Sequence, residues 1–125
     1  EDAIGICRRN IKEAAEHAEQ KAAVVVADIT EFGEEADTVV QNPPFGTKSK
    51  HADRTFLLQA FKIADVVYSM HKIETADFVK KLAADSGFSV TNILPLQLQL
   101  KRTYEFHRSK MRRVEIGLFR IKKTF

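Results

Sequence analysis

Short apolar runs alternate with amphipathic stretches along most of the sequence, and this alternation restricts the possible folds more than any other feature. Apolar runs occupy residues 21–28, 36–42 and 66–70, and amphipathic segments with helical spacing separate most of them. Strands that alternate with helices pair in parallel, because each helix returns the chain to the same end of the sheet. Runs of this kind are typical of strands that are covered on both faces. The sequence therefore predicts an open, mostly parallel α/β sheet.

Three amphipathic stretches are predicted to be helices. The first extends from residue 2 to about residue 20, with Ile4, Cys7 and Ile11 on its apolar side. The second begins near Asp53, which we expect to cap it. The third is expected to end at Gly87, because glycine accepts the backbone conformation that follows a helix. The residues expected to face the core from the second and third helices are Phe56, Leu57, Ala60, Phe61, Ala64, Phe78, Val79, Leu82 and Ala83.

The end of the sequence predicts an antiparallel hairpin. Residues 88–94 form an apolar run, residues 96–100 alternate between apolar and polar, and residues 114–118 alternate again. The segment between the last two is too short for a crossover helix, so the strands that flank it should pair antiparallel. We expect a single domain over residues 1–125, which is long enough to bury a core.

The charge distribution suggests a partner that carries phosphate groups. Residues 101–125 contain nine Lys or Arg residues and two acids, a net charge of +7. The first hundred residues contain 11 basic and 15 acidic residues, a net charge of −4. A basic block of this kind is a candidate for phosphate contact, and a solvated charged surface is the common alternative.

A membrane segment, an internal disulfide and a metal site are not expected from this sequence. The longest apolar stretches are far shorter than the roughly 20 residues that span a bilayer, so we expect no membrane segment. Cys7 is the only cysteine, and it is interpreted as a small core residue of a protein in the reducing cytoplasm. The four histidines are scattered along the chain, so no metal site is expected.

Residues 41–48, QNPPFGTK, place two prolines, a phenylalanine, a glycine and a lysine directly after a predicted strand. Proline fixes φ, has no N–H and pushes the preceding residue into an extended conformation. The side-chain carbonyl of Asn42 and the backbone carbonyl of Pro43 can therefore be held so that together they accept both hydrogens of a planar amino group. Phe45 can stack on the ring that carries this amine. The turn is predicted to be a clamp for a flat, amino-bearing ring.

Two other predicted strands end in polar residues at the same edge of the sheet as this clamp. Ligands of open α/β sheets bind beyond the carboxyl ends of the strands. Asp28 ends one predicted strand, Asn42 follows the next, and residues 69–72 end the third. Their convergence predicts a functional site at this edge.

Residues 42–45, NPPF, resemble the (D/N)PP(Y/F) motif of class I S-adenosylmethionine-dependent amino-methyltransferases. The longer segments DTVVQNPPFGTK, VYSMHK and YEFHRSK resemble the methyltransferase-like family that makes N6-methyladenosine in small-subunit ribosomal RNA. The resemblance covers nearly the whole chain. It implies a Rossmann-like sheet, S-adenosylmethionine as cofactor, and methyl transfer to the exocyclic amine of a flipped adenine in single-stranded or loop RNA.

The resemblance also assigns roles to matching residues. Asn42, Pro43 and Pro44 would form the catalytic corner that holds the target amine, and Phe45 would stack on the adenine. No general base is strictly required, because methyl transfer from a sulfonium releases a neutral leaving group and orientation carries most of the catalysis. The four-residue motif indicates amino-methylation but specifies the substrate weakly, since related enzymes modify adenine, cytosine, guanine or glutamine.

On the cofactor side, Asp28, Ile29 and Asn42 match positions that would contact S-adenosylmethionine. The family's glycine-rich loop and the acid that binds the cofactor ribose have no counterpart in the sequence. Glu1 and Asp2 resemble the residues just after that acid. We therefore expect the sequence to be the C-terminal part of a methyltransferase catalytic domain, without its first two strands, and to bind the cofactor poorly.

Further residues are predicted to contact RNA. Lys48 and Lys50 follow the clamp and are placed to guide RNA toward it. His71 and Lys72, at a strand end, are candidates for contact with phosphate or the flipped base, and a surface pair without function is the alternative. In the basic tail, aromatic and cationic residues interleave as in single-stranded RNA sites, although the aromatic residues could instead cover the sheet. The predicted contacts in the tail are Tyr104, His107, Arg108 and Lys110.

The apolar run that begins at Ala22 and ends at Ala27 would lie at an edge of the family's sheet. An apolar edge strand promotes aggregation unless another element covers it. Related enzymes pair this edge with a small zinc-binding activator protein by strand addition, and the resemblance implies the same partner here.

Two other functions remain open on the sequence alone. A noncatalytic RNA-binding module would use the basic tail and the aromatic clamp without a cofactor. An amino-methyltransferase that acts on another nucleobase or on a protein glutamine would use the same corner. A glutamine-modifying enzyme has no need for the charge of +7 in the last 25 residues, which favours an RNA substrate.

Overall fold

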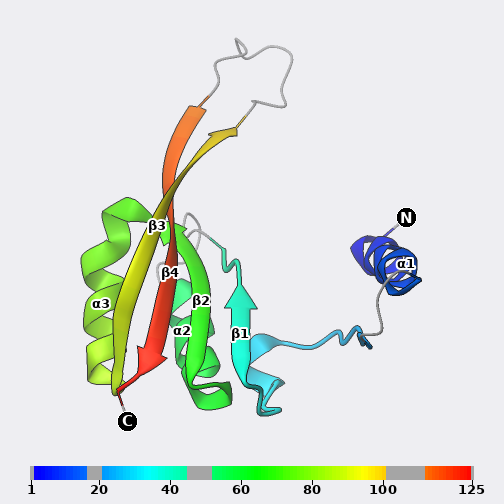
Figure 1. Ribbon diagram of the computed structural model, residues 1–125, viewed down its shortest axis with the longest axis horizontal. Coiled ribbons are helices and arrows are strands. Elements are labelled where there is room, and N and C mark those ends of the chain that lie inside the picture. The colour runs from blue at the N-terminus through cyan, green and yellow to red at the C-terminus, as the bar shows by residue number, and fades with distance from the viewer. Residues whose placement is uncertain (1, 17–20, 45–51, 101–111, 125) are drawn as a thin grey trace.

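A computed structural model describes residues 2–16, 21–44, 52–100 and 112–124. Helices and strands alternate in it, as Figure 1 shows. The helical elements are α1 (Ala3–Ala15), the short 3-10 helices η1 (Ile29–Glu31) and η2 (Ile73–Thr75), α2 (Ala52–Ile63) and α3 (Ala76–Asp85). The strands are β1 (Thr38–Gln41), β2 (Val66–Lys72), β3 (Phe88–Leu100) and β4 (Arg112–Lys123).

The four strands form one mixed sheet in the order β1-β2-β4-β3 (Figure 1). β1 pairs in parallel with β2, whereas β4 pairs antiparallel with both β2 and β3. β1, β2 and β3 therefore run in the same direction, and β4 lies between β2 and β3 in the opposite direction. The predicted α/β fold class and the C-terminal hairpin are confirmed. The position of β4 inside the sheet was not part of the sequence prediction.

The core lies between one face of the sheet and the helices α2 and α3. Its buried residues come from α2, α3 and the strands β2, β3 and β4, and Phe119 of β4 is completely buried. Burying a side chain of this size contributes about 1.5–3 kcal/mol. The predicted inward positions Leu57, Val79 and Ala83 are confirmed, whereas Phe78 is 36% exposed. Phe78 precedes Val79 by one residue, so its side chain lies about 100° around the helix.

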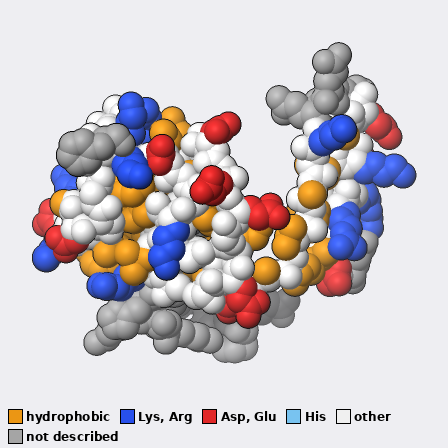
Figure 2. All heavy atoms as spheres, turned by 90° about the horizontal axis from the view of Figure 1, so that it is seen from below, with side chains coloured by type: hydrophobic (Ala, Val, Ile, Leu, Met, Phe, Trp, Pro, Cys, Tyr) orange, Lys and Arg blue, Asp and Glu red, His pale blue; other side chains and the backbone are white. Residues whose placement is uncertain are grey.

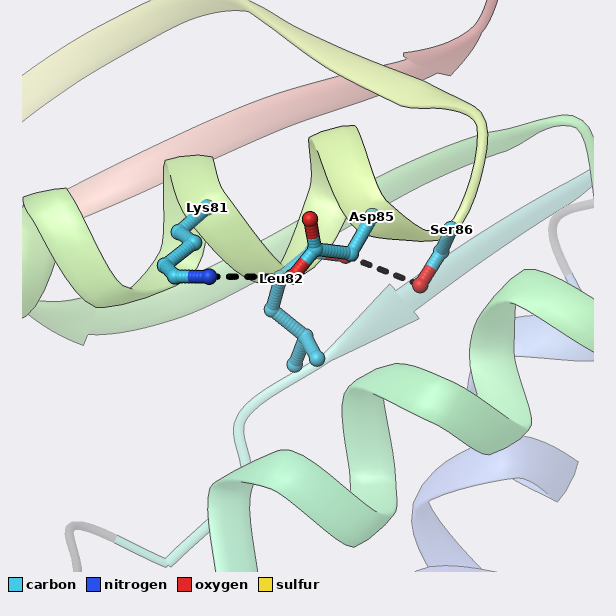
Figure 3. Close-up of polar contacts among 4 residues, drawn as sticks. All are labelled: Lys81, Leu82, Asp85 and Ser86. Carbon is cyan, nitrogen blue, oxygen red and sulfur yellow. Dashed lines mark hydrogen bonds and ion pairs between the residues drawn. The ribbon is translucent and has the colours of Figure 1, made fainter.

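The end of α3 shows how the sequence stops this helix (Figure 3). The Ser86 hydroxyl donates to the carbonyl of Leu82 at 2.8 Å, and Gly87 follows with a φ of 80°. Positive φ favours glycine, so the predicted helix end at Gly87 is confirmed. Figure 3 also shows the ion pair between Lys81 and Asp85, at 3.3 Å. Both side chains are exposed, so this pair contributes little to stability.

The N-terminal part of the chain differs from the prediction. Residues 21–28 are not a strand: no described strand pairs with them, and Val25 and Val26 are 63% and 69% exposed. A strand requires a neighbour that accepts and donates its backbone hydrogen bonds, and apolar sequence cannot replace one. Figure 2 shows hydrophobic side chains on the surface of the narrow segment that joins α1 to the sheet.

The first helix is also shorter and more exposed than predicted. α1 ends at Ala15, has no buried residue and lies apart from the sheet (Figure 1). Its N-terminus is capped by Asp2, whose Oδ1 accepts the N–H of Gly5 at 2.8 Å. The interpretation of Cys7 as a core residue is wrong, because Cys7 is exposed. An amphipathic pattern indicates which side of a helix can be buried and does not supply the element that buries it.

Two smaller differences concern element ends. Asp53 lies within the first turn of α2, where its Oδ1 accepts the N–H of Arg54 at 2.9 Å, so it does not precede the helix as expected. Residues 88–100, expected as two segments, form the single strand β3. Pro95 lies inside this strand, which is compatible with pairing because β3 is at an edge of the sheet.

Replacement of Gly87 by alanine is expected to lower the free energy of unfolding by about 1–2 kcal/mol, because a Cβ atom disfavours positive φ. Gly33→Ala is the matched control: Gly33 does not have positive φ, and an added Cβ would meet no atom within 4 Å. Urea denaturation of both variants tests this. An equal loss of stability in the two variants would contradict the conformational explanation.

Candidate functional site

The predicted clamp directly follows β1 at the carboxyl end of the strand. Asn42 and Pro44 are exposed, whereas Pro43 is buried. The last residue pair between β1 and β2 is Gln41 with Ser69, so the clamp lies beside the final residues of β2. A buried proline between two exposed residues anchors the backbone of the corner while Asn42 stays accessible to a ligand.

A chain of hydrogen bonds connects the end of β1 to β2 just beneath this corner. Nε2 of Gln41 donates to Oγ of Ser69 at 3.0 Å. The same Oγ lies 2.6 Å from Nε2 of His71. Ser69 and His71 are 0% and 2% exposed, on the face of β2 that packs against the core. We call these three residues the Gln41–Ser69–His71 chain. Because its members satisfy one another, it can stay buried without a large desolvation cost.

The environment of His71 keeps its imidazole neutral. Burial lowers the pKa of His71 to about 4, although the carboxylate of Asp53 opposes this shift. The ring also meets Phe119 edge-on, with centroids 5.5 Å apart. A neutral imidazole accepts a hydrogen bond at one nitrogen. The Ser69 hydroxyl can therefore donate to Nε2 while it accepts from Gln41, which gives the two hydrogen bonds of the chain consistent directions.

This geometry bears on the expected contact of His71 with RNA. The sequence placed His71 at a strand end as a candidate contact for RNA phosphate or the flipped base, and its contact with the base stays a prediction. The ring is buried and uncharged, which disfavours the contact with phosphate. It therefore offers neither a surface nor a positive charge to an anion. The neighbouring Lys72 is half-buried, and its Nζ lies 4.0 Å from Oε1 of the exposed Glu74. The contact of Lys72 with RNA stays a prediction.

The predicted cofactor contacts lie at η1. Oδ1 of Asp28 accepts the Thr30 hydroxyl at 2.6 Å and the Thr30 N–H at 2.9 Å. These two bonds, the hydroxyl first, lower the pKa of Asp28 below its ordinary value, so the exposed carboxylate is ionised at neutral pH. Ile29 is half-buried beside it. Asp28 thus caps η1 and presents a fixed negative charge directly before Ile29.

An apolar cavity of about 330 Å³ lies between η1, β1 and α2. Ile29, Phe32 and Phe56 are among the residues that line it. The Gln59 side chain donates to the carbonyl of Phe32 at 2.5 Å and so ties this wall to α2. Apolar walls beside one charged group are typical of pockets that hold a planar ring.

Several roles in this site were not predicted from the sequence, although residues 69–72 were named as a strand end and His71 as a candidate RNA contact. Ser69 and His71 are polar residues at alternate positions of an otherwise apolar strand, and this pattern could have indicated a buried polar pair. Gln41 carries no such signal, because its role depends on which residue of β2 lies opposite. Phe32 was missed because the segment that contains it has no periodic pattern.

The remaining predicted contacts lie outside the described residues and stay predictions: Phe45, Lys48, Lys50, Tyr104, His107, Arg108 and Lys110. Within the described ranges, no cluster of three or more His, Cys, Asp or Glu residues is arranged to hold a metal ion. None of the helices in the same ranges is long and apolar enough to cross a bilayer.

Comparison with known proteins points to one family. The chain is 35% identical over 130 residues to the Danio rerio protein named rRNA N(6)-adenosine-methyltransferase METTL5, covering 99% of this chain and 61% of that protein. A Pyrococcus horikoshii protein, PH1948, described as a candidate RNA methyltransferase, has a crystal structure that matches with a TM-score of 0.77 at 40% identity. This match covers 92% of the chain and 57% of PH1948. Over nearly its whole length the chain is thus similar to the methyltransferase-like family.

The methyltransferase fold extends to more distant proteins. Magnesium protoporphyrin IX methyltransferase from Synechocystis PCC 6803, solved with bound SAM, matches with a TM-score of 0.69 at 14% identity, over 97% of this chain and 54% of that one. No protein-family model matches the chain. The chain spans between 40% and 61% of the length of the curated relatives that it matches.

Acidification is expected to destabilise the protein partly through His71. The folded pKa of about 4 lies below the ordinary value of 6.5, so between these values the unfolded chain binds a proton that the folded protein does not. The free energy of unfolding should therefore fall as the pH falls, by up to about 3 kcal/mol for this residue between about pH 7 and about pH 4.

Urea denaturation of the wild type and of His71→Gln across this pH range measures the effect. Glutamine does not take up a proton here, so the stability advantage of the wild type should shrink as the pH falls. A difference that stays constant with pH would show that His71 is not held neutral.

Proposed function

We propose that this protein transfers a methyl group from S-adenosylmethionine to the N6 amine of an adenine in RNA, with ribosomal RNA as the substrate class. The observation that carries the proposal is the corner after β1, where exposed Asn42 precedes buried Pro43 at the carboxyl end of a parallel strand. The similarity to the methyltransferase-like family supports the reaction class. The names of the Danio rerio relative and of PH1948 support RNA as the substrate.

In this proposal the corner acts by orientation. The Asn42 side-chain carbonyl and the Pro43 backbone carbonyl accept the two hydrogens of the adenine N6, which fixes the plane of the amine and the direction of its lone pair. Correct alignment of reacting groups can supply several kcal/mol of the barrier reduction. The proton leaves to solvent after the methyl group has been transferred. Extrusion of the base costs a few kcal/mol, which favours an unpaired adenine.

The described residues fit the adenine end of S-adenosylmethionine. Ile29 and the aromatic residues Phe32 and Phe56 offer apolar walls to a purine ring. The ionised Asp28 lies directly before Ile29 and can accept from a ring amine. When bound, the cofactor supplies the methyl group as an electrophile. The part of the chain that the structure describes accounts for this end of the cofactor alone.

We also propose that a small zinc-binding activator protein covers the segment from Ala22 to Ala27 by strand addition. Support comes from exposed Val25 and Val26, which no strand of the described chain pairs with. Extended apolar backbone of this kind is a template for an added strand. The cytoplasm is the proposed location, since the lone, exposed Cys7 suits a reducing compartment.

Replacement of Asn42 by alanine is expected to lower kcat about 100-fold while the Kd for RNA changes less than about threefold, because Asn42 orients the amine and does not bind phosphate. Asn92→Ala is the matched control, since Asn92 is also exposed and lies on the distant edge strand β3. Methyl transfer to a loop RNA and filter binding measure the two quantities. Equal losses in kcat and affinity would contradict the orienting role.

Purification of the tagged protein from cells is expected to recover a small zinc-containing partner. The double substitution Val25→Lys and Val26→Lys should remove this partner, because two charges disrupt an apolar strand interface. Lys80→Glu, on the exposed side of α3, is the control and should retain it. Zinc analysis of the eluted complex gives the readout. Recovery of a soluble protein without any zinc-containing partner would refute the proposal.

A further inference from the structure

The end of β1 has few backbone contacts to hold it. β1 contains four residues and, among the strands that the structure describes, pairs only with β2, and the pairing stops at Gln41 and Ser69. Ends of short strands fray readily, because the last residue has a paired neighbour on one side only. Yet the residue that follows immediately, Asn42, is the one that must be held for catalysis.

The Gln41–Ser69–His71 chain lies where this backbone pairing stops. Gln41 is the last residue of β1, and its side chain donates across to Ser69 at 3.0 Å. Ser69 in turn lies 2.6 Å from Nε2 of His71, further along β2. The side chain of Gln41 thus adds a tie between the two strands at the position directly before the clamp.

The inner part of the chain is rigid. Ser69 and His71 are buried in the core, and the edge-on contact with Phe119 restricts the imidazole ring of His71. Phe119 itself is fully buried between the sheet and the helices. A side chain tied to groups that cannot move transmits their fixed position to the next residue.

We propose that Gln41, Ser69 and His71 are positioning residues for Asn42, an inference that rests on the proposed function. Ser69 and His71 do not touch the substrate, since both are buried beneath the corner. They hold the end of β1 through Gln41. The backbone that carries the Asn42 side chain is therefore fixed in position. A misplacement of about 1 Å at a reacting group can cost about 100-fold in rate.

A purely structural role would give a different result. A buried polar chain that only stabilises the sheet would lower stability when broken, and any loss of activity would follow the loss of folded protein. A positioning unit would lower kcat in fully folded protein. Its members would also act together, so that breaking a second link adds nothing to the first.

The test uses Ser69→Ala, Gln41→Leu and the double variant, with Val67→Ala as the control. Val67 lies two residues before Ser69 on the same buried face of β2, so its truncation destabilises the core without removing a hydrogen bond. In folded protein, each single variant should lose about 10-fold to 100-fold in kcat, with KM for RNA and for S-adenosylmethionine within about threefold of the wild type.

The double variant should lose no more than either single variant, and Val67→Ala should keep its kcat within about threefold. The proposal is overturned if Ser69→Ala retains full kcat, if the two losses multiply, or if Val67→Ala loses as much as Ser69→Ala.

A second measurement keeps the inference separate from the proposed function. The order parameter of the Asn42 backbone amide, from ¹⁵N relaxation, should fall from about 0.85 toward about 0.6 in Ser69→Ala but not in Val67→Ala. An unchanged order parameter in Ser69→Ala overturns the positioning role even if methylation is observed. A wild type that binds S-adenosylmethionine and yet methylates no adenine refutes the proposed function, while this measurement still decides the positioning role.

Discussion

The packing of one sheet face against α2 and α3 is the interaction on which the rest of the structure depends. Phe119 and Ile121 of β4, Val67 of β2 and Leu57 of α2 are all buried in this layer. Each large side chain contributes about 1.5–3 kcal/mol, so the layer holds β2 and β4 in fixed positions. Within the described part of the chain β2 is the one strand beside β1, and the place of β1 therefore follows from that of β2.

Close packing in the same layer also sets the environment of the polar chain. Gly117 lies opposite His71 in the pairing of β2 with β4, and a Cβ at this position would come within 2.8 Å of the Phe119 ring and 2.9 Å of Ile73 and Ile93. The absence of a side chain thus gives Phe119 its room beside the His71 ring. The imidazole remains neutral because burial disfavours its charged form, and the neutral ring can accept a hydrogen bond from Ser69.

The site thereby combines a rigid interior with an accessible surface. Ser69, His71 and Pro43 are buried, whereas Asn42 directly beside them is exposed. A catalyst that works by orientation requires this combination, since the acceptor atoms must meet the substrate while the backbone that carries them stays in place. Asp28 directly precedes Ile29, which lines the apolar cavity along β1, and the corner follows the same strand, so the proposed sites of the cofactor and of the target amine share β1.

Much of the fold could be predicted because local patterns determine local structure. The helical spacing of Leu57, Val79 and Ala83, the positive φ at Gly87 and the alternation in the C-terminal hairpin each depend on neighbours within a few residues. The predicted strand at residues 21–28 and the burial of Cys7 were wrong for the opposite reason. Both required a partner elsewhere in the fold, and an apolar sequence states only that burial would be favourable.

The candidate site also has one part that local sequence predicts and another part that depends on contacts elsewhere in the fold. Two consecutive prolines after Asn42 stiffen the corner whatever surrounds them, so the sequence by itself determined that the backbone of residues 42–44 is restricted. Only the tertiary structure decided that Gln41 lies opposite Ser69, that His71 is buried against Phe119, and that β4 lies between β2 and β3. Strand order and register bring together residues far apart in the chain, and they follow from the packing of the whole core, which no single segment encodes.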